Sequence, residues 1–208
     1  MSTLVLVRHA QSATFEEDSD RLTLVGERQA RALGEFWRQR GVRFDEAYCG
    51  EFTRHRQTAE LAGFSQYIAT SDFNEYDAGG ILRSAGVVAP PKDNRELQTR
   101  FDALMPQWLA GTLQSPDIES WRGFSGRVRR AIRNIIGAEG TSRRVVVFTS
   151  GGPIGLTVQT VVGAPDAMAL ELNWRIRNCS LTEFVFSGGR ISLDSFNATP
   201  HLNEVTFR

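Results

Sequence analysis

The sequence has few cysteines, no long apolar run and no excess of charge of either sign. Cys49 and Cys179 are the only cysteines among 208 residues. They are too few for a disulfide framework, and neither has a second Cys or a His at metal-ligand spacing. No apolar run approaches the roughly 18 residues that a membrane-spanning helix needs. The N-terminal residues lack the basic segment and longer apolar core of a secretory signal. We therefore expect a cytoplasmic protein without a metal site.

Charge is balanced, with 24 Lys plus Arg against 24 Asp plus Glu. This balance gives no overall attraction to nucleic acid or to an anionic membrane, so we expect neither as a partner. Two arginine-rich stretches, 38–43 and 127–133, have helical spacing and are interpreted mainly as solvated helix faces. A binding site for an anion must then be built locally, from a few arginines.

Short apolar runs alternate with amphipathic stretches along most of the chain. The expected strands cover 4–7, 44–49, 67–69 and 145–148, and the expected helices cover 26–40, 54–62 and 151–162. Near the C-terminus, 176–186 and 190–196 flank Ser187-Gly188-Gly189 and predict an antiparallel hairpin. This order predicts an α/β fold: a three-layer α/β/α sandwich whose mostly parallel sheet carries helices on both faces.

The middle of the chain is less regular. Gly79-Gly80, Pro90-Pro91 and Pro116 interrupt it, with helices expected at 94–110 and 118–137. We interpret about 77–140 as a helical cap inserted into a single domain that spans residues 1–208.

Polar side chains follow three of the expected strands. Arg8 and His9 follow the first, Arg54 lies after the second, and Thr149-Ser150-Gly151-Gly152 opens the helix after a later one. In parallel sheets, ligands bind at the carboxyl ends of the strands. Arginines grip phosphate oxygens, and a helix N-terminus offers unpaired N–H groups to an anion. A neutral histidine among them is a candidate nucleophile for phosphorus, and a nearby carboxyl group is a candidate proton donor.

Five motifs in this order resemble the histidine phosphatase superfamily, in the branch that includes cofactor-dependent phosphoglycerate mutases. They are Arg8-His9-Ala10-Gln11-Ser12, Asp20-Arg21-Leu22-Thr23, Arg54-His55-Arg56-Gln57-Thr58-Ala59, Phe73-Asn74-Glu75-Tyr76 and Thr149-Ser150-Gly151-Gly152. The resemblance implies that His9 is the phosphorylated nucleophile and that Glu75 is the general acid and base. It implies that Arg8 and Arg54 clamp the phosphoryl oxygens and that neither a metal nor an organic cofactor is needed. The start of the helix after the later strand adds Ser150 and Gly151 as candidate phosphate contacts.

Two positions depart from the family pattern. Ser150 stands where the family has a second histidine, and Phe15 stands where an asparagine often helps to bind phosphate. Ser150 is also a natural helix N-cap. His55 is one candidate for the missing histidine, but its place beside Arg54 suggests that it faces away. Asp72, Asp77 and Glu51 are alternatives to Glu75 as the acid.

The sequence thus favours a metal-independent, histidine acid phosphatase-like hydrolase that works through a phosphohistidine. Its partner would be a small phosphorylated molecule or inorganic phosphate. The alternative is a weakened or inactive protein of the same fold that binds a phosphorylated ligand. A mutase is the third reading, disfavoured because the tryptophan–asparagine pair of the mutases is missing after the Arg-His motif. Substrate and oligomeric state are left open.

Overall fold

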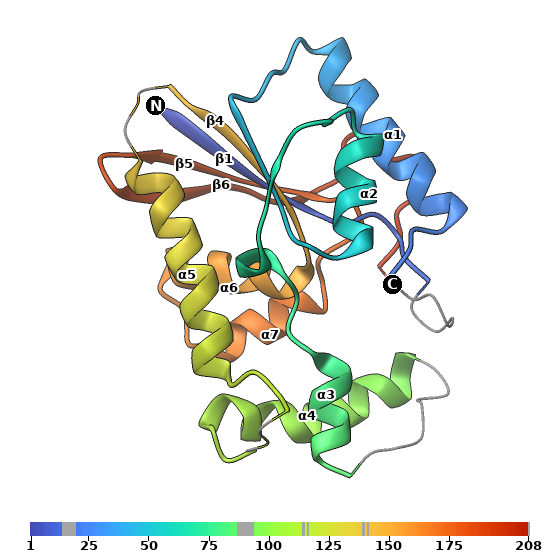
Figure 1. Ribbon diagram of the computed structural model, residues 1–208, viewed down its shortest axis with the longest axis vertical. Helices are drawn as coiled ribbons and strands as arrows, with labels where there is room; N and C mark the ends of the chain where they lie inside the picture. The colour runs from blue at the N-terminus through green and yellow to red at the C-terminus, as the bar shows by residue number, and fades with distance from the viewer. Residues whose placement is uncertain are drawn as a thin grey trace.

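The computed structural model describes residues 1–13, 20–86, 94–113, 115, 117–138, 140 and 142–207. Phe15, Pro90, Pro91 and Pro116 lie outside the described residues. The strands that it describes are β1 (Ser2–Arg8), β2 (Glu46–Cys49), β3 (Ile68–Ala69), β4 (Arg144–Thr149), β5 (Leu181–Ser187) and β6 (Arg190–Ala198). They form one sheet in the order β3-β2-β4-β1-β5-β6 (Figure 1).

The pairing of the strands confirms a mostly parallel sheet with an antiparallel C-terminal hairpin. β1 pairs in parallel with β4, β4 with β2, and β2 with β3, whereas β5 runs antiparallel to both β1 and β6. Arg8 and Thr149 are register partners at the ends of β1 and β4. The residues that follow these two strands therefore emerge side by side.

Side chains alternate along the central strands and bury both faces of the sheet. On β1, Leu4 and Leu6 join one apolar cluster, and Val5 and Val7 join the other. Helices α1 (Leu24–Gln39) and α2 (Thr53–Leu61) cover the second face. The first face is covered by α5 (Trp121–Gly137), α6 (Gly151–Val162) and α7 (Ala167–Asn173), as Figure 1 shows. The three-layer α/β/α sandwich is confirmed.

Helix α1 begins earlier than its apolar spacing predicts because Thr23 caps it. The Thr23 hydroxyl accepts a hydrogen bond from the Gly26 N–H at 3.1 Å, which satisfies one of the unpaired donors of the first turn. A Cβ at Gly26 would lie 2.1 Å from the Gln11 carbonyl oxygen. Glycine thus lets α1 press closely against the loop that follows β1.

Helices α3 (Ala78–Ser84) and α4 (Asn94–Ala110) lie beyond the carboxyl ends of the strands (Figure 1). The expected break at Gly79-Gly80 is wrong, because both glycines lie inside α3, where Asp77 accepts from the Gly80 N–H at 2.8 Å. Helix α5 starts at Trp121 rather than 118, since Ser120 caps it. Helix α5 packs on a face of the sheet, so within 77–140 only α3 and α4 lie where a cap over the strand ends is expected. The boundaries of the cap remain a proposal.

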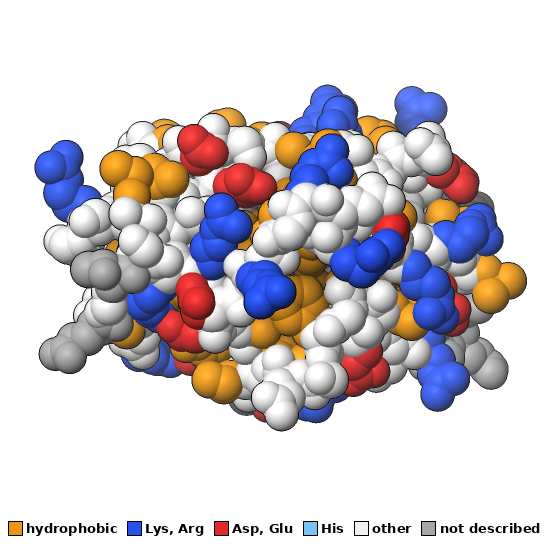
Figure 2. All heavy atoms as spheres, turned by 90° about the horizontal axis from the view of Figure 1, so that it is seen from above, with side chains coloured by type: hydrophobic (Ala, Val, Ile, Leu, Met, Phe, Trp, Pro, Cys, Tyr) orange, Lys and Arg blue, Asp and Glu red, His pale blue; other side chains and the backbone are white. Residues whose placement is uncertain are grey.

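The end of the molecule opposite α3 and α4 carries basic side chains scattered among acidic and apolar ones (Figure 2). Within the stretch 38–43, Arg38, Arg40 and Arg43 are exposed, and Arg38 pairs with Glu35 at 2.6 Å. The interpretation of this stretch as a solvated surface is confirmed. Among the described helices, none is long and apolar enough to cross a membrane.

Candidate active site

A cleft of about 730 Å³ opens at the carboxyl ends of β1 and β2. It brings together four of the predicted site residues: Arg8, His9, Arg54 and Glu75. The rest of its described lining consists of Ser12, Phe52, Tyr76, Asp77, Ala78, Gly79, Phe101, Asn173 and Asn178. The cleft therefore joins the end of β1 and the loop after it, the start of α2, the segment that leads into α3, helices α4 and α7, and the segment before β5.

His9 lies at the floor of the cleft, directly after β1. Its backbone N–H donates to the Thr149 carbonyl at 2.8 Å, which ties it to β4. Its Nδ1 lies 2.8 Å from the Ala10 carbonyl oxygen. Because a carbonyl only accepts, Nδ1 carries the proton and Nε2 keeps its lone pair. Burial, followed by the charges of Arg54 and Arg8, holds the pKa of His9 well below its usual value, so the ring is neutral near pH 7.

Arg8 is anchored by backbone carbonyls on one side of its guanidinium. Its Nη1 donates to the carbonyl of Ile176 and, at 2.9 Å, to that of Phe207. The C-terminal segment is itself held by Gln29, whose Nε2 donates to the Thr206 hydroxyl at 3.0 Å. These contacts fix the Arg8 side chain next to His9 before any ligand binds.

Arg54, in the first turn of α2, is oriented by Asp20. Its Nη1 donates to Asp20 Oδ1 at 2.7 Å, and the other carboxylate oxygen accepts from the Thr53 N–H at 2.7 Å. The guanidinium also lies 4.5 Å above the Phe52 ring. In the sequence, Asp20 is distinguished only as part of a family motif. Its role as the partner of Arg54 depends on folding, because 34 residues separate them.

Glu75 lines the same cleft and lies against the start of α6. One carboxylate oxygen accepts from the Gly152 N–H at 2.9 Å, and the other accepts from the Tyr76 N–H at 3.2 Å. Burial raises the pKa of the Glu75 carboxyl, although these N–H groups and the charges of Arg54 and Arg8 act in the opposite direction. The N-terminus of α6, expected to be open to an external anion, thus serves Glu75 through Gly152.

The three alternative acids are placed less favourably than Glu75. Asp72 pairs with Arg130 at 3.3 Å, and Glu51 is exposed; neither is among the described residues lining the cleft. Asp77 lines the cleft, but it caps α3 and pairs with Arg83.

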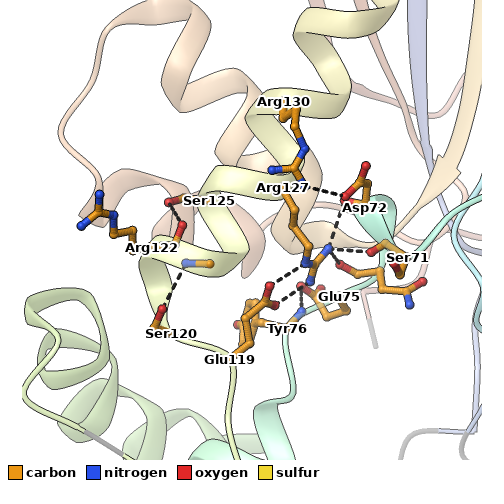
Figure 3. Close-up of polar contacts among 12 residues, drawn as sticks. Ser71, Asp72, Glu75, Tyr76, Glu119, Ser120, Arg122, Ser125, Arg127 and Arg130 are labelled. Atoms are coloured by element: carbon orange, nitrogen blue, oxygen red, sulfur yellow. Dashed lines mark hydrogen bonds and ion pairs between the residues drawn. The ribbon is translucent and has the colours of Figure 1, made fainter.

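Arg127 of α5 holds the loop that carries Glu75 (Figure 3). Its Nη1 donates to the carbonyls of Ser71, Asp72 and Asn74 at 2.9, 3.0 and 2.9 Å, and its Nε and Nη2 grip the Glu119 carboxylate. Only 14% of the side chain is exposed. The interpretation of 127–133 as a solvated face is therefore wrong at Arg127, which turns inward although the helical spacing matches that of its exposed neighbours.

Ser150 and Gly151 are buried and do not belong to the described lining of the cleft. Ser150 occupies the N-cap position of α6, but its side chain makes no capping hydrogen bond to the described residues of the first turn. Its Oγ lies 2.6 Å from His55 Nε2 instead. The expectation that His55 faces away is wrong: its ring is buried, with its centroid 5.7 Å from that of His9. The phosphate contacts of Ser150 and Gly151 remain predictions.

Both cysteines are buried, free thiols, and burial raises the pKa of the Cys49 thiol to about 12. In the part of the chain that the structure describes, no group of three His, Cys, Asp or Glu side chains is placed to hold a metal ion.

Known proteins with similar structures include two phosphatases. A mutant phosphoserine phosphatase from Entamoeba histolytica, in complex with phosphoserine, has a TM-score of 0.69 at 18% identity and covers 97% of this chain and 100% of its own. A mycobacterial glucosyl-3-phosphoglycerate phosphatase with inorganic phosphate has a TM-score of 0.69 at 20% identity, over 98% of this chain and 100% of its own. At these identities the likeness shows the fold.

Sequence comparison is more specific. A 2,3-bisphosphoglycerate-dependent phosphoglycerate mutase of Methylobacterium sp. (strain 4-46) is 31% identical over 193 residues, which cover 84% of this chain and 91% of the relative. The profile of the histidine phosphatase superfamily (branch 1) matches residues 4–199. Together with the cleft described above, this match shows that the chain belongs to branch 1 of the histidine phosphatase superfamily.

Proposed function

We propose that the protein is a metal-independent phosphomonoester hydrolase that works through a phosphorylated His9. The proposal rests on the tautomer of the His9 ring and on its place beside two arginines. Its Nδ1 donates to the Ala10 carbonyl, and the ring lies in a cleft that Arg8 and Arg54 also line. A neutral imidazole with a bare Nε2 beside two guanidinium groups suits attack on a phosphoryl group, because the arginines offset the charge on its oxygens.

In the first half-reaction, Nε2 attacks phosphorus as the ester P–O bond breaks. The protonated carboxyl group of Glu75 gives its proton to the leaving oxygen. The raised pKa of Glu75 keeps that proton available at a higher pH than for an ordinary carboxyl group. The products are the alcohol, a phosphoryl group on His9 and a Glu75 carboxylate.

In the second half-reaction, the Glu75 carboxylate takes a proton from water, and the water oxygen attacks phosphorus. The N–P bond breaks, its electron pair returns to Nε2, and inorganic phosphate leaves. Glu75 is protonated again and His9 is neutral, so the cycle closes without a metal or a redox partner. Arg8 and Arg54 would hold the phosphoryl oxygens through both steps.

The pKa shifts predict a bell-shaped dependence of kcat/KM on pH. Activity rises as His9 loses its proton, which happens well below the usual histidine value because its pKa is lowered. Activity falls as the Glu75 carboxyl ionises, above the ordinary value of 4.5 because its pKa is raised. We therefore expect kcat/KM, measured from initial rates of phosphate release, to have its optimum in mildly acidic solution. A plateau that extends unchanged into alkaline solution would contradict the assignment of Glu75 as the acid.

Replacing Arg127 with Met should lower kcat by about 100-fold, because Glu75 loses the support of its loop and small displacements of catalytic groups have effects of this size. The matched control is Arg130→Met on the same helix, whose pairing with Asp72 is exposed and should contribute little. Steady-state kinetics and thermal unfolding of both variants provide the test. Equal activity of the two variants would show that Arg127 does not position Glu75.

The cleft favours substrates with an apolar or aromatic leaving group. Phe52, Tyr76 and Phe101 line it, and Arg8 and Arg54 are the cations among the described lining residues. A panel of monoesters should show higher kcat/KM for aryl and bulky alkyl phosphates than for phosphoglycerates, because Asp77 adds a carboxylate to the lining of the cleft. Absence of phosphate release from the whole panel would overturn the proposed hydrolase.

The same panel separates a hydrolase from a mutase. The Methylobacterium relative is described as a phosphoglycerate mutase, so transfer of phosphate between positions of phosphoglycerate is the second candidate activity. A mutase moves the phosphoryl group without net release of phosphate. We expect net release; isomerisation of phosphoglycerate without it would reverse the assignment.

A further inference from the structure

A buried pair of side chains, His55 and Ser150, lies beneath the nucleophile. His55 extends from α2 and Ser150 precedes α6, so the 2.6 Å contact between Nε2 and Oγ joins the helices on opposite faces of the sheet. His55 is fully buried and Ser150 is 1% exposed. A serine at this position ordinarily caps its helix, but here its side chain is turned to the histidine.

The pair is also adjacent to His9. Arg8 and Thr149 are register partners at the ends of β1 and β4, so His9 and Ser150 are the next residues of neighbouring parallel strands. The rings of His55 and His9 have centroids 5.7 Å apart and are tilted by 39°. The three side chains thus form one cluster behind the cleft.

The surroundings of the His55 ring determine its tautomer. Nδ1 is buried and has no hydrogen-bond partner among the described residues. It lies against Gly50, where an added Cβ would be 2.1 Å away. A buried N–H without an acceptor is rarer in proteins than an unpaired acceptor, so Nδ1 is the bare nitrogen and Nε2 carries the proton. His55 then donates to Ser150 Oγ, and the Ser150 hydroxyl proton remains available to a further acceptor.

We propose that His55 is a positioning residue that directs the Ser150 hydroxyl at the phosphoryl group carried by His9. This inference rests on the proposed function and deepens it. When His9 carries a phosphoryl group, an oxygen of that group can accept the Ser150 hydroxyl proton. His9 and Ser150 follow Arg8 and Thr149, which are register partners of β1 and β4. The proposed donor combines an imidazole on α2 with a hydroxyl before α6.

A double-mutant cycle tests the proposal. Ser150→Ala and His55→Leu should each lower kcat by about 100-fold, the size of effect seen when one donor to a developing oxyanion is removed. Inhibition by vanadate, which mimics the pentacoordinate phosphorus, should weaken in proportion, while KM changes little. The double variant should be no worse than either single variant, because both remove the same hydrogen bond. Losses that multiply would overturn the pairing.

Conservative and reciprocal variants separate positioning from packing. His55→Gln keeps an N–H close to the place of Nε2 and should recover most of the activity that His55→Leu loses. Ser150→His alone should not gain activity, because its ring would collide with His55; the double variant His55→Ala/Ser150→His removes that collision and should exceed His55→Ala. His201→Gln, at a histidine outside the described cleft lining, is the control for fold and activity.

The outcomes distinguish this inference from the proposed function. A wild-type protein that releases no phosphate from any monoester overturns both. A wild-type protein that turns over through phospho-His9, with His55→Gln as impaired as His55→Leu at equal thermal stability, overturns only the role of the pair. Gly50→Ala gives an independent check, since its Cβ would displace the His55 ring; unchanged kcat in this variant would also contradict the proposal.

Discussion

His9→Ala should lower phosphatase turnover by about 10⁵-fold or more, because the covalent route is lost with the nucleophile. The substitution removes the imidazole but keeps the backbone hydrogen bond from residue 9 to the Thr149 carbonyl. Arg8 and Arg54 keep their anchors on backbone carbonyls and on Asp20. We therefore expect the variant to fold and to bind inorganic phosphate with an affinity similar to that of the wild type.

The direct measurement is the detection of an acid-labile phosphate label on the protein. Wild-type protein quenched during turnover of a labelled monoester should carry phosphate on a histidine, and His9→Ala should carry none. The chain has three histidines, so His201→Gln is the matched control and should label normally. Label that persists in His9→Ala would identify another nucleophile, and turnover without any label would favour direct attack by water.

Glu75→Gln should lower kcat for an alkyl monoester by about 10³-fold, within the range for general acid catalysis. An alkoxide is a poor leaving group and needs the proton that glutamine cannot supply. A 4-nitrophenolate leaves without a proton, so the first half-reaction should survive with 4-nitrophenyl phosphate. The second half-reaction still needs a base, and the variant should release a burst of nitrophenol and accumulate phospho-His9.

The burst distinguishes a catalytic Glu75 from one that supports the fold. Asp72→Asn, which changes a nearby carboxylate paired with exposed Arg130, should show wild-type kinetics with both substrates. With the nitrophenyl ester, neither protein should show the alkaline limb in kcat/KM, because this leaving group needs no proton from Glu75. With the alkyl ester, the limb should appear in the wild type and vanish in Glu75→Gln, because no carboxyl group then ionises. An equal loss of activity with both leaving groups, without a burst, would show that the acid lies elsewhere.

Much of the fold could be predicted from local patterns of apolar residues in the sequence. The apolar runs at 4–7 and 145–148 lie within β1 and β4. Such runs require burial on both faces, whatever the rest of the chain does. Two short helices, α3 and α7, were missed. Each has seven residues, and helices of that length are held mainly by tertiary packing, which leaves a weak signal in their own sequence.

The site residues divide in the same way. Arg8, His9, Arg54 and Glu75 were named from motifs at strand ends, and all four line the cleft. Arg127 was interpreted as solvated because its spacing on α5 does not distinguish it from the exposed arginines beside it. It turns inward because three carbonyls of the segment 71–74, which begins with the 3-10 helix Ser71–Phe73, lie within its reach.

The sequence by itself determined the α/β order, the family and the residues at the strand ends, because each follows from a short periodicity or a contiguous motif. Only the tertiary structure decided how those residues are supported. His55 and Ser150 are 95 residues apart, and Arg127 and Asn74 are 53 apart. Such contacts depend on how the helices dock on the two faces of the sheet. Residues so far apart in the sequence form hydrogen bonds only when folding brings them close in space. The local spacing of residues in the sequence carries no information on that distance.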